Sequence, residues 1–200
     1  MIGAISLIRR RDDIDAVRFR GHWVDIHGPL VCRLPSLRSY AQSHVVAALT
    51  PVAGAMAIDG FAELAFDSVA ARAAAYGSAE LAACDSDSPG FIGAVSRLVT
   101  EATVVIARPD VAGVAKFVIL FPPGAPGDAA PDWAAVERLG PRGLIWHEVL
   151  EQGPTPNSVV SELHCPVVSM AEVWVSGAAG TAAIDAGGAG VFSVIEHRFR

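Results

Sequence analysis

The sequence lacks the features that direct a protein to a membrane, to nucleic acid or to secretion. No uninterrupted apolar run approaches the roughly 20 residues of a transmembrane helix. The apolar start, residues 1–8, is too short for a signal peptide, and its arginines follow it instead of preceding it. The net charge is −6 and no basic stripe is present, which argues against nucleic acid and anionic membranes as partners. We therefore expect a soluble, cytoplasmic protein.

Signals for cofactors and cross-links are equally sparse. The three cysteines, Cys32, Cys84 and Cys165, are odd in number and form no Cys-x-x-Cys pair, so neither a disulfide framework nor a structural zinc site is indicated. No glycine-rich phosphate loop follows the first predicted strand, which argues against a nucleotide. His22 and His27 are five residues apart, a poor helical spacing for two metal ligands. We expect no metal and no cofactor.

What the sequence does contain is apolar character and a repeating order of elements. Hydrophobic residues make up 52% of the 200 residues, enough for strands covered on both faces or for an extensive subunit contact. Periodicity and β-branched runs predict the following strands: 2–8, 37–45, 61–66, 95–106, 116–121, 144–150, 167–175 and 191–199. Helical patterns fall between them: about 13–28, 68–76, 79–83, 133–139 and 178–186.

This order predicts an α+β fold made of two tandem ferredoxin-like β-α-β-β-α-β repeats, residues 1–107 and 108–200. The clearest internal echo is Ala62–Phe66 against Ala171–Val175, since each begins with Ala-Glu and is followed by a serine and an Ala-rich segment. A single such sheet leaves one face open to water. Two sheets placed face to face would close one intrachain α+β barrel and enclose a pocket between them. Fused barrels of this kind could associate further as a homodimer.

Alternation along residues 37–45 places two sets of side chains on opposite faces of the second strand. One set is polar and aromatic: Arg38, Tyr40, Gln42 and His44. The other set is smaller, and we expect it to pack beneath the helices: Leu37, Ser39, Ala41, Ser43 and Val45. The first set is therefore expected to face the pocket.

Several of these residues are suited to proton transfer, because imidazole titrates near neutrality. His27 is the first candidate, at the end of the helical stripe, with Tyr40 and His44 next. His22 lies about 140° from His27 on an α-helix, so the two should not share a pocket unless the helix ends between them. His22 could equally be a surface histidine, and Trp23 fits the core better than a ligand platform. Glu63 is either a pocket carboxylate that orients a histidine or half of a buried ion pair with Arg38 or Arg97.

The amino-terminal half also resembles the EthD family of the dimeric α+β barrel superfamily. The resemblance rests on His22-Trp23-Val24-Asp25-Ile26-His27-Gly28-Pro29, on Leu34-Pro35-Ser36-Leu37-Arg38-Ser39-Tyr40 with Gln42-Ser43-His44-Val45, and on the segment Asp59–Ser68. It covers residues 1 to about 107. The second half has no counterpart of these histidine motifs, so one functional pocket per chain is expected.

The resemblance implies a pocket for a small, often aromatic or lactone-like molecule, without a fixed activity. Related barrels include muconolactone-type isomerases, polyketide cyclases and cofactor-independent monooxygenases. His27 and Tyr40 lie where the methyl-muconolactone isomerases place a site histidine and tyrosine, whereas Leu64 replaces their strand cysteine. That difference argues against the same isomerisation.

Together these observations predict a cofactor-free, small-molecule enzyme of catabolic or natural-product metabolism. The expected chemistry is histidine-based proton transfer, of the isomerase, cyclase or lyase type. His27, Tyr40 and His44 are the expected catalytic residues, and the expected substrate contacts are His22, Trp23, Gln42 and Glu63. Two alternatives remain: a cofactor-independent monooxygenase, and a non-catalytic ligand-binding accessory protein of an oxidation pathway.

Overall fold

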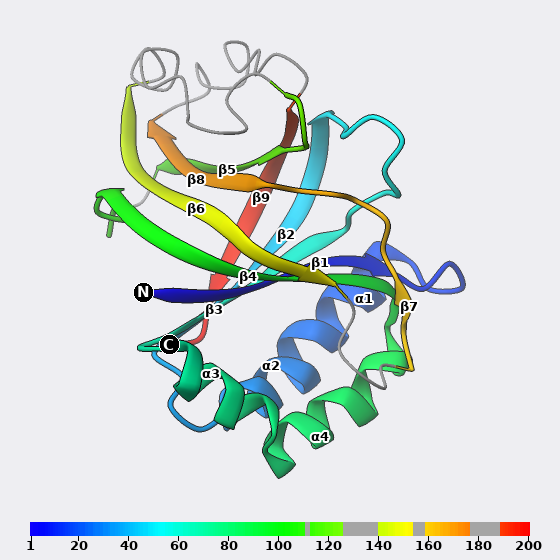
Figure 1. The fold of residues 1–200 in the computed structure, drawn as a ribbon. Coiled ribbons are helices and arrows are strands. Elements are labelled where there is room, and N and C mark those ends of the chain that lie inside the picture. Colours follow the sequence, from blue (N-terminus) through cyan, green and yellow to red (C-terminus); the bar gives the residue numbers. More distant parts are fainter. Residues whose placement is uncertain (111–112, 126–139, 154–158, 177–188) are drawn as a thin grey trace.

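The computed structural model describes residues 1–110, 113–125, 140–153, 159–176 and 189–200. Within these ranges the chain forms an α+β structure in which strands close into a barrel and helices gather on one side (Figure 1). None of the helices in these ranges has both the length and the apolar composition needed to cross a bilayer.

The amino-terminal half follows the expected order of strands and helices. Its strands are β1 (Ile2–Arg10), β2 (Ser39–Thr50), β3 (Gly60–Phe66) and β4 (Ile92–Ile106). Between β1 and β2 run α1 (Ala16–His22), the π-helix η1 (Trp23–His27) and α2 (Gly28–Val31). Between β3 and β4 run α3 (Val69–Tyr76), α4 (Ala79–Asp87) and the short 3₁₀ turn η2 (Ser88–Gly90).

The carboxy-terminal half contributes β5 (Val114–Phe121), β6 (Pro141–Gly153), β7 (Ser161–Glu162), β8 (Ser169–Ser176) and β9 (Gly190–Arg198). Each strand expected from the sequence is present, with its ends shifted. The two-residue β7 was not predicted. The helices expected at 133–139 and 178–186 lie outside the described residues.

The strands close in the order β1-β3-β2-β9-β5-β8-β6-β4 and return to β1, while β7 adds to the side of β4. The order is β4-β1-β3-β2 in the first half and β9-β5-β8-β6 in the second. When the two-residue β7 is left aside, both halves therefore place their fourth, first, third and second strands side by side. Closure leaves no long unpaired edge among the described strands. The tandem ferredoxin-like repeat itself stays a prediction, because the helices that would complete its second copy are not described.

Two apolar layers surround the amino-terminal sheet. The inner layer fills the barrel and includes Ile5, Leu7, Phe61, Leu98, Val118, Leu120 and Phe192. The outer layer lies between the sheet and the helices and includes Phe19, Trp23, Tyr40, Leu64, Phe66 and Phe91. Because side chains alternate along a strand, each strand serves both layers.

The face assignment of β2 expected from the sequence is wrong. Tyr40 packs in the layer beneath the helices, and Val45, on the opposite face, packs against the barrel interior. Both faces of β2 are covered here, so polarity does not determine which face turns inward. The size of the side chains does, because the two sides offer different amounts of space. Small residues such as Ala41 and Ser43 suit the crowded interior, while the larger ones fill the gap under the helices. The expected pocket between the two sheets is accordingly occupied by side chains.

Candidate active site

A π-helix sets the geometry of the two leading histidines. In η1 the N–H of Gly28 donates to the carbonyl of Trp23, five residues back. Pro29 has no N–H to donate to the carbonyl of Asp25, so the α-helical register cannot continue through this turn. The wider π turn brings residues five apart onto one side, which is common at functional sites. The α-helix thus ends between His22 and His27, which is the condition under which the sequence analysis allowed both to reach one site.

Both histidines contact a single carboxylate. Asp87, the last residue of α4, lies 2.9 Å from Nε2 of His22 through Oδ1 and 2.9 Å from Nδ1 of His27 through Oδ2. The ring of His22 also stacks on Phe91 at 4.9 Å. No local pattern in the sequence points to Asp87, because its pairing with His27 spans 60 residues.

This pairing fixes the state of His27. A carboxylate only accepts hydrogen bonds, so Nδ1 of His27 carries the proton and Nε2 keeps its lone pair. Nε2 makes no hydrogen bond to any described residue. Burial lowers the pKa of His27, against the opposing pull of Asp87. The ring is therefore neutral at pH 7 and oriented as a base.

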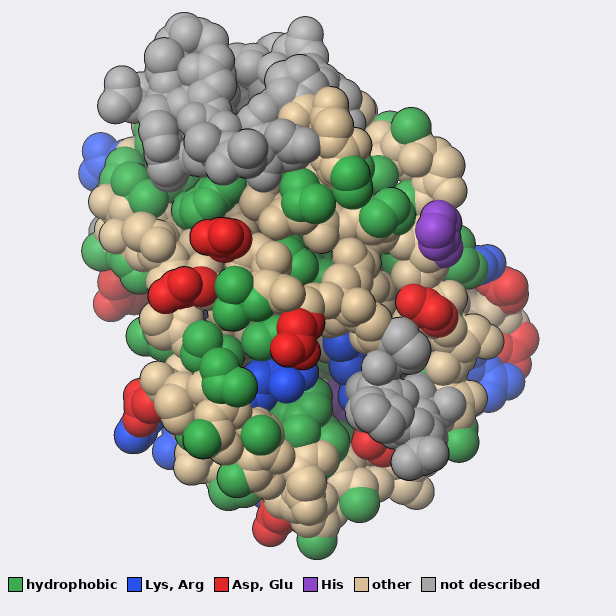
Figure 2. Space-filling model, viewed as in Figure 1, with side chains coloured by type: hydrophobic (Ala, Val, Ile, Leu, Met, Phe, Trp, Pro, Cys, Tyr) green, Lys and Arg blue, Asp and Glu red, His purple; other side chains and the backbone are tan. Residues whose placement is uncertain are grey.

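His27 lines a small chamber between the helices and the outer face of the amino-terminal sheet. The chamber has a volume of about 50 Å³, and its wall includes Tyr40, Trp23, Leu64 and Cys84. A larger cleft of about 240 Å³ lies next to it, between α4, β4 and residues 159–160. Figure 2 shows the surface hollowed between the strands and the helices.

Tyr40 is the second predicted residue that reaches the chamber. Its hydroxyl accepts a hydrogen bond from Nε2 of Gln42 at 2.7 Å, and its ring stacks on Phe199 at 4.9 Å. Burial raises the pKa of Tyr40, so the phenol stays protonated at neutral pH. Its O–H can therefore donate to an oxygen atom of a ligand.

Gln42 and His44 line neither hollow. Gln42 donates to the carbonyl of Trp23 at 2.8 Å and lies 3.1 Å from Nε2 of His44 through Oε1. Burial lowers the pKa of His44 to about 4, and its ring lies 4.7 Å from that of Trp23. Both residues therefore contact Trp23, the first residue of the π-helix, and stabilise it. Trp23 is fully buried, as the core interpretation predicts, and also forms part of the chamber wall.

Glu63 lies apart from the histidines, inside the barrel. Its Oε2 is 2.6 Å from Nζ of Lys116, so its basic partner is a lysine and neither of the two predicted arginines. Arg38 pairs with Asp67 and Arg97 with Asp85.

Lys116 is the centre of a larger buried cluster that the sequence analysis missed. Its Nζ also lies 2.7 Å from Glu172 and 2.9 Å from Glu196. The three carboxylates are close enough to hold a cation, and the ammonium of Lys116 already contacts each of them. A signal was available, because Lys116 is the only lysine of the chain and stands within an apolar strand.

The cluster continues to His147, whose Nε2 lies 2.8 Å from Oε1 of Glu172 and whose Nδ1 lies 3.1 Å from Oγ1 of Thr100. Against the effect of burial, Lys116 and the hydrogen bond from His147 hold the pKa of Glu172 well below its usual range. Glu63 and Glu172 are the two glutamates of the repeated Ala-Glu pair. Both contact the same lysine, Lys116, inside the barrel.

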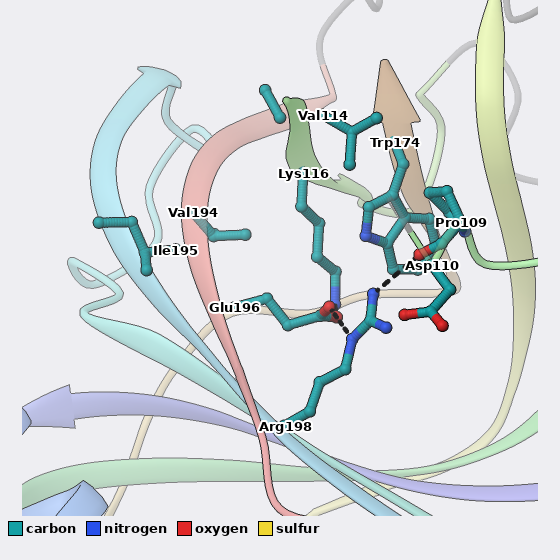
Figure 3. Close-up of a pocket in the computed structure, with 10 residues that line it drawn as sticks. Pro109, Asp110, Val114, Lys116, Trp174, Val194, Ile195, Glu196 and Arg198 are labelled. Carbon is teal, nitrogen blue, oxygen red and sulfur yellow. Dashed lines mark hydrogen bonds and ion pairs between the residues drawn. The ribbon is translucent and has the colours of Figure 1, made fainter. Parts of the chain in front are cut away.

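A third hollow, of about 480 Å³, opens at the barrel end next to this cluster. Figure 3 shows Lys116, Glu196 and Arg198 converging on it beside Trp174. Glu196 is paired with Lys116 and, at 2.6 Å, with Nε of Arg198. Glu196 is thus engaged by both cations, and the described lining of the hollow contains no counterpart of the oriented neutral imidazole in the chamber.

Comparisons with known proteins agree with the fold and with the amino-terminal motifs. The crystal structure of an anthrone oxidase-like protein superposes with a TM-score of 0.63 at 9% identity, covering 98% of this chain and 92% of that one. An EthD-family protein from Bacillus halodurans C-125 gives a TM-score of 0.43 at 24% identity, covering 50% of this chain and 97% of that one. No curated protein matches the sequence. The EthD domain model matches residues 11–94, and this part of the chain, which holds His22, His27 and Tyr40, is therefore an EthD domain.

Proposed function

We propose that the protein is a small-molecule enzyme in which His27 transfers a proton on an aromatic or lactone-like substrate, as an isomerase, cyclase or lyase. The observation that carries the proposal is the neutral His27 ring, which is held through Nδ1 by Asp87, lines the chamber and makes no hydrogen bond through Nε2 to any described residue. A carboxylate that orients an imidazole and stabilises its charged form is the arrangement used by histidine bases in enzymes.

In this scheme Nε2 of His27 takes a proton from a carbon or a phenol of the substrate, and Asp87 stabilises the imidazolium that forms. The Tyr40 hydroxyl donates to a substrate oxygen. Return of the proton to a different atom completes an isomerisation or cyclisation, with no cofactor required. His22 contributes by sharing Asp87, which fixes the position of the carboxylate.

The same deprotonation could instead prepare a phenol to react with oxygen, and the oxidase-like name of the structure that shares the fold is compatible with this second function. A panel of phenols, quinols and lactones, followed by product analysis and by an oxygen electrode, separates the two. Oxygen uptake that depends on a quinol supports the monooxygenase. Turnover without oxygen uptake supports the isomerase, cyclase or lyase.

The residue test compares His27→Gln and Asp87→Asn with His164→Gln, a control at an exposed histidine. We expect His27→Gln to lower kcat by about 10²–10⁴-fold, the usual contribution of general acid–base catalysis. Because the pKa of His27 is lowered, kcat/KM of the unaltered enzyme should rise with pH below 6.5 and be level at neutrality. Ligand binding with no turnover by the unaltered protein, or full turnover by His27→Gln, would establish that His27 is not the base.

A further inference from the structure

The chamber and the neighbouring cleft share part of their walls. Five residues contribute to the walls of both hollows: Asp85, Ser88, Ile92, Val95 and Arg97. These residues come from the end of α4, from η2 and from the start of β4, and we call this shared wall between the cleft and the chamber the neck. A ligand in the cleft therefore contacts residues that also border the chamber of His27.

The neck contains one strong positive charge. Arg97 is the only Lys or Arg among the described residues that line the cleft and the chamber. Its side chain is 15% exposed, and its guanidinium lies 3.0 Å from Oδ1 of Asp85. The charge of Arg97 acts on His27, because it is one of the influences that lower the pKa of that ring. Arg97 and His27 thus both border the chamber.

The volumes constrain how a substrate lies. An aromatic ring fills a cavity of roughly 150 Å³, whereas the chamber offers about 50 Å³ and the cleft about 240 Å³. The ring must therefore remain in the cleft, with its reactive group directed at the neck. Aliphatic side chains in the cleft wall, such as Ile92 and Val95, suit a flat apolar ring.

We propose that Arg97 is a further catalytic residue, which stabilises the oxyanion formed when His27 removes a proton from a neutral, ring-bearing carbonyl compound or phenol. The inference rests on the proposed function of His27. The broken C–H or O–H bond leaves its electron pair on the substrate, where it becomes an enolate or phenolate oxygen, and the proton goes to Nε2 of His27. The N–H groups of Arg97 donate to that oxygen. Return of the proton to another carbon restores neutrality, so no oxidant is needed.

The test uses 4-nitrophenol, whose phenolate is coloured, so that the ionisation of the bound dye is measured directly by absorbance during a pH titration. We expect the unaltered protein to lower the pKa of the bound dye by at least one unit. Arg97→Gln should raise it again by about one unit, a tenfold loss of phenolate stabilisation, and Arg97→Lys should recover part of the shift. Arg38→Gln removes an arginine that pairs with Asp67 outside both hollows and should change nothing.

An Arg97→Gln protein that folds, binds the dye and ionises it like the unaltered protein would overturn the role of Arg97, and so would failure of the unaltered protein to bind the dye. His27→Gln is titrated in parallel. If this variant matches the unaltered protein while Arg97→Gln does not, the proposed base is wrong but the anion site stands. Circular dichroism of each variant separates loss of fold from loss of the charge.

Discussion

Two glycines of the amino-terminal helical segment have different surroundings. A Cβ on Gly28 would lie 2.5 Å from the ring of Phe199 and 3.2 Å from Nε2 of Gln42, whereas a Cβ on Gly21 would meet nothing within 4 Å. Gly28 therefore lets the turn after the π-helix approach the residues that hold Tyr40.

We predict that Gly28→Ala destabilises the protein by about 1–3 kcal/mol, the usual cost of overpacking. Gly21→Ala, the matched control in α1, should stabilise it by about 0.5–1 kcal/mol through helix propensity. Urea unfolding of both variants measures the difference. Equal effects of the two substitutions would mean that the close approach at Gly28 has no energetic weight.

At the scale of elements, Gln42 connects β2 to the π-helix. Its amide donates to the carbonyl of Trp23 and to the Tyr40 hydroxyl, and its side-chain oxygen contacts His44. Gln42 does not touch the chamber, so its effect on chemistry must pass through the residues that it positions.

We predict that Gln42→Leu destabilises the fold by about 1–3 kcal/mol, because buried polar partners lose their hydrogen bonds. It should also lower kcat more than it raises KM, since His27 at the end of the π-helix loses its alignment. Unfolding curves and steady-state kinetics on the same preparation check both parts. Normal kcat in a destabilised variant would assign Gln42 a structural role alone.

The order of elements was predictable, because β-branched runs and Ala-rich stretches are local signals. The orientation of β2 was not, since the usual alternation assumes one wet face and a barrel strand has none. The π-helix depends on Pro29 and on a hydrogen bond from Gln42, which lies on strand β2. The partnership of His27 with Asp87, and that of Glu63 with Lys116, join residues far apart in sequence, which no local pattern encodes.

On the scale of the whole molecule, the two halves meet through charge as well as through hydrocarbon. Glu63 of β3 and Glu172 of β8 both contact Lys116 of β5. Burial, reinforced by the negative charge of Glu172, raises the pKa of Glu63 to about 8 from its ordinary 4.5. At neutral pH the folded protein therefore holds a proton on Glu63 that the unfolded chain would release.

This difference has a defined sign. Between about pH 4.5 and pH 8 the folded state binds more protons than the unfolded state, so the contribution of Glu63 to the free energy of unfolding falls as the pH rises and levels off above pH 8. We predict that Glu63→Gln, which remains neutral, flattens this part of the stability curve. Urea midpoints from pH 5 to 9 would show it, and an unchanged slope would assign the proton elsewhere.

The isolation of Lys116 has one more consequence. It is the only lysine in the sequence and only 3% exposed, so in the native protein its amine is shielded from an amine-reactive reagent. Acylation of Lys116 requires the barrel to open. One mass increment on one peptide, followed over time, would therefore report how often the barrel opens, without any engineered probe.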